Sequence, residues 1–201
     1  KRELESFAYS VSHDLRAPLR GIEGFSRILS ERYAESLDAT GRDYLQRVRK
    51  ATGRMGELID ALLKLSRIGR SGLAVEDVDL SDLVEEVVAG LADADPGRWV
   101  DLRVQPGMRV SADRALLHTL LENLLGNAWK FTRLTDTPRI EVGAAAATDG
   151  RAWFRIADNG AGFAPEYANK LFKPFQRLHS QDEFAGHGIG LASVKRIVER
   201  L

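Results

Sequence analysis

The chain has 201 residues, 44% of them hydrophobic and 29% charged, which is ordinary for a globular protein. Its 29 Lys and Arg residues balance 29 Asp and Glu residues, which disfavours a nucleic-acid partner because phosphate-binding proteins usually carry a basic excess. No cysteine occurs, which excludes disulfides, and no apolar run approaches the roughly 20 residues of a membrane span. We therefore expect a cytoplasmic location for this chain, in a whole protein that is either cytosolic or tethered to a membrane through segments outside this chain.

The first two predicted elements are long helices. Apolar residues recur every three or four positions from Leu4 to Leu29, which predicts one helix over residues 1 to about 34. After the polar stretch "ESLDATG", a second stripe from Leu45 to Leu65 predicts another. Two helices joined by a short loop form an antiparallel hairpin. A lone hairpin cannot bury two wide apolar stripes, so we expect a homodimer in which two hairpins form a four-helix bundle.

Beyond "GRSGL" the pattern changes to alternating strands and helices. Strands are predicted in "LAVEDVD", "WVDLRV", "RIEVGAAAA" and "RAWFRIAD", and helices begin near Ser81, Asp113 and Gly190, with Ser81 as the cap of the first. This mixture indicates a second domain of the α/β type. We predict a helical domain over residues 1–70, a linker over 71–78 and an α/β domain over 79–201.

A titratable pair lies in the first helix, in "SVSHDLRAPLRGIEGF". His13 lies two positions from both Val11 and Leu15, about 200° around the helix from each, so it should face solvent. Asp14 could accept the Nδ1 hydrogen and leave Nε2 as a nucleophile. Pro18 removes a backbone hydrogen bond and should bend the helix. From this segment alone, an ordinary surface histidine beside a surface aspartate is the simpler interpretation.

The segment "LLENLLGNAWKFT" places two amides and an ammonium on one helical face. Asn123 and Asn127 are four residues apart, and Lys130 follows one turn later. Amide oxygens are hard ligands that suit Mg²⁺, and a lysine offers a point charge to phosphate. The alternative is that both asparagines are solvated, but the surrounding leucines predict a mostly buried helix, where unpaired amides are costly. The sequence therefore favours a magnesium and triphosphate site.

The segment "IADNGAGF" follows a predicted strand. Asp158, Gly160 and Gly162 form a D-x-G-x-G turn, in which glycines allow close approach to a flat ligand. A buried carboxylate beside such a turn could accept a hydrogen bond from an adenine amino group. Asp-Asn-Gly also makes an ordinary tight turn, so this motif alone is weak.

The segment "GHGIGLASV" places Gly186, Gly188 and Gly190 before an apolar helical run. Glycines at a helix start expose backbone amides and the positive end of the helix dipole, which suits phosphates. The segment "GHGIGLASV" matches neither the dinucleotide-binding fingerprint nor the Walker motif. The irregular stretch "LFKPFQRLHSQDEFAGH" before it indicates a mobile lid.

In this order, the motifs resemble those of the two-component sensor histidine kinases, of the phytochrome-like and PAS-linked kind. "SHDLRAPL" resembles the phosphoacceptor box, "NLLGNAWKFT" the N box, "DNGAGF" the first glycine box, "LFKPF" the F box and "GHGIGL" the second glycine box. The resemblance covers nearly the whole chain. It implies a multidomain protein, in which a hairpin forming a dimeric four-helix bundle is followed by an α/β sandwich of the histidine kinase and Hsp90-like ATPase type.

The resemblance also implies a role for each motif residue. His13 would be the phosphoacceptor and Asp14 its general base, and the substrate and cofactor would be ATP and Mg²⁺. The nucleotide and its metal would be held by Asn127 and Asn123 (Mg²⁺), Lys130 (phosphates), Asp158 (adenine), Gly160 and Gly162 (the first glycine box), Arg177 (γ-phosphate), and Gly186, Gly188 and Gly190 (triphosphate). The implied partners are a second copy, the receiver domain of a response regulator and an upstream sensor domain.

Two departures from the family pattern stand out. Relatives that also dephosphorylate their regulator carry Thr or Asn four residues after the histidine, and Ala17 stands there, which puts that activity in doubt. The chain ends at Leu201, where relatives continue with strands that complete the sandwich, so we expect an unpaired sheet edge and weaker nucleotide binding. Two rival functions remain: a chaperone-like ATPase module, which would need glutamate in place of Asn123, and a non-catalytic dimerisation scaffold.

Overall fold

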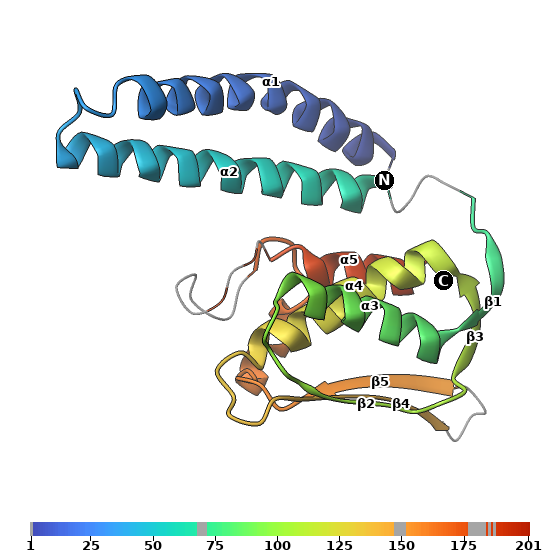
Figure 1. Ribbon diagram of the computed structural model, residues 1–201. Helices are drawn as coiled ribbons and strands as arrows, with labels where there is room; N and C mark the ends of the chain where they lie inside the picture. The colour runs from blue at the N-terminus through green and yellow to red at the C-terminus, as the bar shows by residue number, and fades with distance from the viewer. Residues whose placement is uncertain (1, 68–71, 147–151, 177–183, 185, 187) are drawn as a thin grey trace. The chain divides into compact units, whose positions relative to one another are not determined.

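The computed structural model describes residues 2–67, 72–146, 152–176, 184, 186 and 188–201, with the side chains of residues 2–13, 61, 64–67, 146 and 152 outside the description (Figure 1). The chain divides into two compact units, Lys1–Arg70 and Ser71–Leu201. Each unit is described by itself below. Within the described residues, none of the helices combines the length and the apolar character needed to cross a bilayer.

The first unit is an antiparallel helical hairpin. It consists of α1 (Arg2–Arg32) and α2 (Ala39–Arg67), which confirms the two long helices expected from the apolar period. Asp38 begins α2 by accepting a hydrogen bond from the Gly41 amide at 2.7 Å. Pro18 lies inside α1, and Figure 1 shows that this helix changes direction along its length, as expected of a helix that contains proline.

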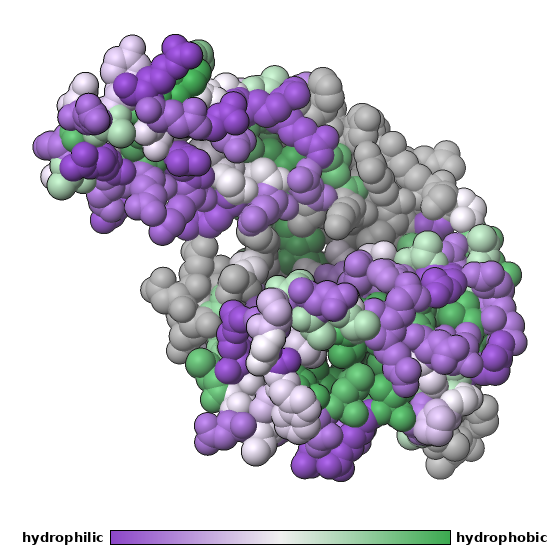
Figure 2. Space-filling model, viewed as in Figure 1, coloured by the Kyte–Doolittle hydropathy of each residue, from purple (hydrophilic) through white to green (hydrophobic). Residues whose placement is uncertain are grey.

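Among the side chains that the structure describes, few of those in the hairpin are buried. Leu19 of α1 packs with Ile59 and Leu63 of α2 in one small cluster. By contrast, Phe25 is 71% exposed and Met55 is 48% exposed. Figure 2 shows hydrophobic groups reaching the surface among hydrophilic ones. The hairpin therefore leaves much of its apolar stripes uncovered within one chain.

The second unit is an α/β domain, as predicted. Three helices cover one side of a three-stranded sheet whose order is β2-β4-β5, and a separate two-stranded sheet pairs β1 with β3 (Figure 1). β2 and β4 are parallel, whereas the other strand pairs are antiparallel. The elements are β1 (Val75–Asp79), α3 (Leu80–Ala94), β2 (Asp101–Val104), β3 (Arg109–Asp113), α4 (Arg114–Phe131), β4 (Arg139–Ala146), β5 (Ala152–Asp158), the 3₁₀ helix η1 (Pro165–Lys170) and α5 (Gly190–Val198).

Three details of this unit differ from the sequence expectations. β3 was not predicted, and β1 begins at Val75, inside the segment expected to be a linker. Ser81 is not the cap of α3: Asp79 accepts the capping hydrogen bond from the Asp82 amide at 3.1 Å. The buried Ser81 hydroxyl instead donates to the carbonyl of Gln105 at 2.8 Å and accepts from the Met108 amide at 3.0 Å. The serine therefore joins α3 to the loop before β3.

The core of the second unit lies between the helices and the three-stranded sheet. Val84 of α3, Leu125 of α4 and Ile140 of β4 are fully buried and belong to one continuous cluster. Burial of such a side chain contributes about 1.5–3 kcal/mol. The core fixes α4 against the sheet, and α4 carries the residues on which the candidate site depends.

Candidate nucleotide-binding site

The candidate site is built first on α4. Asn123, Asn127 and Lys130 lie on successive turns of this helix and are half-buried. The Nζ of Lys130 donates to Oδ1 of Asn127 at 3.2 Å, and Nδ2 of Asn123 donates to the Thr119 carbonyl at 2.7 Å. That second bond uses the Nδ2 group and leaves the Oδ1 of Asn123 to act as an acceptor. The helix thus presents amide oxygens and one ammonium together, as the sequence predicted.

The start of α4 is fixed by a buried carboxylate. Asp113 accepts hydrogen bonds from the amides of Ala74 at 3.0 Å and Leu116 at 3.1 Å. These bonds, that from Ala74 first, hold the pKa of Asp113 below its ordinary value, because they stabilise the charged form. Asp113 therefore caps α4 and joins it to the segment before β1.

The first glycine box folds closely around the end of α4. The Ala161 amide donates to the Phe131 carbonyl at 3.1 Å, and a Cβ added at Gly160 would lie 2.5 Å from that oxygen. Only glycine fits there, and Gly162 has a positive φ of 61°. Oδ1 of Asp158 accepts from the Gly160 amide at 2.9 Å.

One expectation at this turn is wrong. Asp158 was expected to be a buried carboxylate, but its side chain is exposed in the described structure. The residue ends β5 at the edge of the sheet, where the neighbouring turn supplies a backbone amide as partner but little covering surface. The carboxylate thus shapes the turn by its bond to Gly160 and remains accessible.

The second glycine box lies against the N box. A Cβ added at Gly190 would lie 2.7 Å from Oδ1 of Asn123, and one added at Gly186 would lie 3.3 Å from Nζ of Lys130. Gly190 begins α5, whose preceding residue Ile189 makes no side-chain capping bond. The first amides of α5 therefore lie beside the polar face of α4. The structure brings together two motifs that lie some sixty positions apart in the sequence.

The F box is tied to the second glycine box through the backbone. The Phe175 amide donates to the Gly188 carbonyl at 2.9 Å, and both residues have positive φ angles, 64° and 70°. A Cβ at Gly188 would lie 2.5 Å from the carbonyl of Gln176, so this approach also requires glycine. The predicted lid falls largely on residues 177–183, and with them Arg177 lies outside the described residues.

Sequence reasoning missed an aromatic pair at this site. The rings of Phe131 and Phe184 meet edge to face with centroids 5.1 Å apart, and Phe184 is buried. The Nζ of Lys130 lies 4.2 Å from the centre of the Phe131 ring, a cation–π distance. The available signal was that Phe131 directly follows the lysine and Phe184 lies two residues before Gly186.

The segment around His13 is described less completely. His13 lies within α1, but its side chain is outside the described residues, so its orientation stays a prediction. The Asp14 side chain is exposed.

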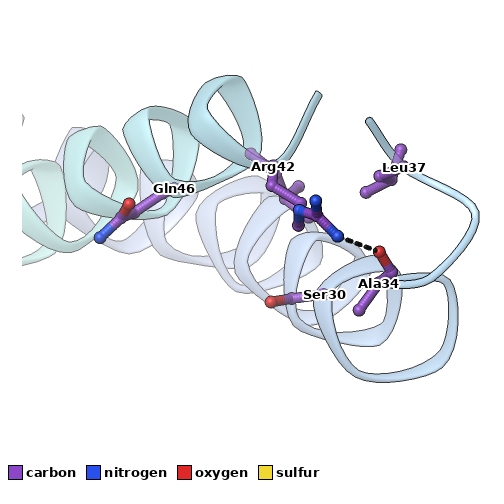
Figure 3. A pocket seen from close by; sticks show the side chains of 6 residues that line it. Ser30, Ala34, Leu37, Arg42 and Gln46 are labelled. Carbon is purple, nitrogen blue, oxygen red and sulfur yellow. Dashed lines mark hydrogen bonds between the residues drawn. The ribbon is translucent and has the colours of Figure 1, made fainter. Parts of the chain in front are cut away.

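A hollow of about 190 Å³ at the turn of the hairpin does not belong to the site (Figure 3). There the Nη1 of Arg42 donates to the Ala34 carbonyl at 3.1 Å, which ties the start of α2 to the segment after α1. The other side chains around it are those of Ser30, Leu37, Leu45 and Gln46. We attribute this hollow to the packing of the turn.

Two family models match the chain. Residues 3–71 match the "His Kinase A (phospho-acceptor) domain", and residues 112–201 match the "Histidine kinase-, DNA gyrase B-, and HSP90-like ATPase". The two matched regions include His13 and every motif residue from Asn123 to Gly190.

Curated relatives are similar along nearly the whole chain. Cyanobacterial phytochrome B of Nostoc sp. is 36% identical over 99% of this chain and 27% of its own length. Sensor histidine kinase TrcS of Mycobacterium tuberculosis is 36% identical over 98% of this chain and 39% of its own length. The chain thus spans between a quarter and two fifths of the length of these relatives.

Solved structures resemble the fold. Full-length ShkA, in complex with AMPPNP, is 29% identical with a TM-score of 0.65, over 96% of this chain and 40% of that one. Histidine kinase AdeS of Acinetobacter baumannii matches 94% of this chain and 87% of its own with a TM-score of 0.57 at 24% identity, a likeness of fold alone.

Proposed function

We infer, because this chain belongs to the two-component sensor histidine kinase family, that it transfers the γ-phosphoryl group of ATP to His13. The phosphohistidine would then donate this group to an aspartate in the receiver domain of a response regulator. The observation that carries this proposal is that Asn123 and Lys130 of α4 lie against Gly190 and Gly186 of the second glycine box. We assign residues 1–70 to dimerisation and phosphotransfer, 71–74 to a linker and 75–201 to ATP binding, since β1 begins at Val75.

The proposed nucleotide site uses groups from both α4 and the start of α5. The amides that begin α5 and the ammonium of Lys130 would hold the phosphates, since both favour negative charge. The exposed Asp158 would accept a hydrogen bond from the adenine amino group, with Gly160 and Gly162 allowing the base to approach. Arg177 remains our candidate for the γ-phosphate.

The amide oxygens of α4 fit a magnesium ion. Oδ1 of Asn127 already accepts from a cation, and Oδ1 of Asn123 points to the start of α5. Mg²⁺ prefers oxygen ligands and usually completes its shell with phosphate oxygens and waters. When bound, the ion would neutralise charge on the transferred group. Asn127 and Asn123 are therefore the residues that would hold it.

The proposed transfer is an in-line displacement. Nε2 of His13 forms a bond to the γ-phosphorus as the bond to the bridging oxygen breaks, and ADP leaves with that oxygen. Asp14 would accept the Nδ1 hydrogen, which keeps the Nε2 lone pair available and stabilises the charged ring that forms. Positioning and electrostatics supply most of the rate in such reactions.

We propose that the active form is a homodimer in the cytoplasm, downstream of a sensor domain. The exposed apolar residues of the hairpin, such as Phe25 and Met55, support this proposal because a second hairpin would bury them. ATP as substrate and a receiver domain as acceptor place the reaction in the cytoplasm. We assign the protein no role with nucleic acid, since its formal net charge is zero. Ala17 stands four residues after His13, where relatives that dephosphorylate their regulator carry Thr or Asn. We therefore assign the protein no phosphatase activity through this position.

The decisive test is labelling with γ-labelled ATP and Mg²⁺. We expect a label that is lost in acid and stable in base on the wild-type chain, and no label on His13→Gln. His118→Gln is the matched control, because His118 is a half-exposed histidine of α4 that lies near Glu86 and Glu122. Equal labelling of wild type and His13→Gln would refute this acceptor, and an unlabelled chain that binds ATP would favour the scaffold.

A further inference from the structure

One ion pair crosses between the two helices of the hairpin close to His13. Nη2 of Arg16 on α1 donates a hydrogen bond to Oδ1 of Asp60 on α2. Both side chains are substantially exposed, at 45% and 60%. Exposed ion pairs contribute about 0–1 kcal/mol to stability. Its effect on the free energy of unfolding is therefore too small to explain its place in the hairpin.

The geometry of α1 relates this pair to His13. At about 100° per residue, Arg16 lies about 60° around the helix from His13, and Leu19 lies about 60° further in the same direction. Leu19 is buried against Ile59 of α2, the neighbour of Asp60. Arg16 thus stands between the buried face of α1 and the face that carries His13, and its bond to Asp60 links that turn to α2.

Pro18 is the reason why α1 needs a contact that restricts its rotation near His13. It lies inside α1 and cannot donate the backbone hydrogen bond that would reach the Asp14 carbonyl. The turn that follows His13 therefore lacks one of the bonds that hold a helix straight. A side-chain bond to the neighbouring helix restricts the rotation that this missing bond allows.

We propose that Arg16 and Asp60 are positioning residues for the phosphoryl transfer. They hold α1 at one rotation about its axis, so that Nε2 of His13 is presented at a fixed angle. This inference rests on the proposed function. In the proposed transfer, neither Arg16 nor Asp60 touches the nucleotide. A small misplacement of reacting groups can cost up to about a hundredfold in rate.

The test measures the first-order rate of His13 labelling at saturating ATP. Arg16→Ala and Asp60→Ala are each expected to lower this rate by about tenfold, with the KM for ATP unchanged because nucleotide contacts are retained. The exchanged double variant, Arg16→Asp with Asp60→Arg, restores the pair and should recover most of the rate. Asp43→Ala with Arg47→Ala is the matched control, since that exposed ion pair lies within α2 alone.

A second donor separates positioning from damage to the hairpin. Phosphoramidate phosphorylates histidine directly, so its reaction with His13 needs no bound ATP and should be unchanged in Arg16→Ala. Loss of both reactions would indicate a disrupted hairpin and overturn the inference. Single variants with the wild-type rate would overturn it too, and so would an exchanged double variant as slow as the single ones, since Arg16 would then act by itself. If the wild type is not labelled by ATP at all, the proposed function fails and this inference fails with it.

Discussion

The two units of the chain differ in how they bury apolar side chains. The α/β unit encloses a continuous cluster that includes the fully buried Leu83 and Leu125, whereas the described hairpin buries only three large apolar residues in its one cluster. Phe25, Ile28 and Val48 of the hairpin remain largely exposed. The α/β unit therefore buries most of its large apolar side chains within itself, while the described part of the hairpin leaves many of its own exposed.

The largest effect is expected in the core of the α/β unit. Leu125→Ala removes a fully buried side chain, and such changes cost about 2–5 kcal/mol because a cavity remains. Urea unfolding of the variant should show this loss in the α/β unit, and ATP binding should weaken because α4 carries Asn123 and Asn127. A cost below about 1 kcal/mol would contradict the packing described for this helix.

An effect of a different kind, smaller for each chain, is expected in the hairpin. Phe25→Ala should weaken self-association, because each buried Phe contributes about 1.5–3 kcal/mol and a dimer buries two copies. Light scattering against concentration would measure the shift toward monomer. Trp99→Ala, a 69% exposed residue of the α/β unit, is the matched control. A variant that dimerises as strongly as the wild type would show that the bundle does not form through this stripe.

Much of the fold of both units could be predicted from the sequence. The period of apolar residues gave both long helices, and the glycines of the motifs marked positions where a Cβ would meet backbone or side-chain atoms, as at Gly160 and Gly190. These signals are local, because they depend on the chain's own period and backbone angles. They say little about which distant groups will meet.

The failures concern residues whose roles depend on distant parts of the chain. β3 is a five-residue strand whose pairing with β1 has no alternating apolar signal, since residues 75–77 of its partner are exposed. Ser81 is bonded to Gln105 and Met108, which no local pattern indicates. The contact of Phe131 with Phe184 likewise joins residues 53 positions apart, and their sequence context reveals it only in hindsight.

The smallest of these effects concerns Asp113, which is a source of pH dependence in the α/β unit. Its pKa is lowered in the folded state by the amides of Ala74 and Leu116. A carboxyl whose pKa is lower when folded adds stability above its unfolded pKa, about 3.9, and this stability is lost as the pH falls through the folded value. Asp113→Asn should remove that part of the pH dependence and cost about 0.5–1.5 kcal/mol at neutral pH, because an amide has one acceptor oxygen and keeps only one of the two backbone bonds.

Urea unfolding at neutral pH and at several acidic pH values would measure this effect. Asp136→Asn is the matched control, since Asp136 is an exposed aspartate of the same unit. If Asp113→Asn loses stability in acid as steeply as the wild type, the proposed role of this carboxylate as the cap of α4 is wrong.

The most direct measurement is to locate the phosphoryl group after incubation with ATP and Mg²⁺, by mass spectrometry of peptides kept at alkaline pH. We predict that it lies on the peptide of residues 3–16, which contains His13 and no other histidine, and that Asn127→Ala abolishes it. A phosphoryl group on any other peptide, or one that persists undiminished in Asn127→Ala, would contradict the account.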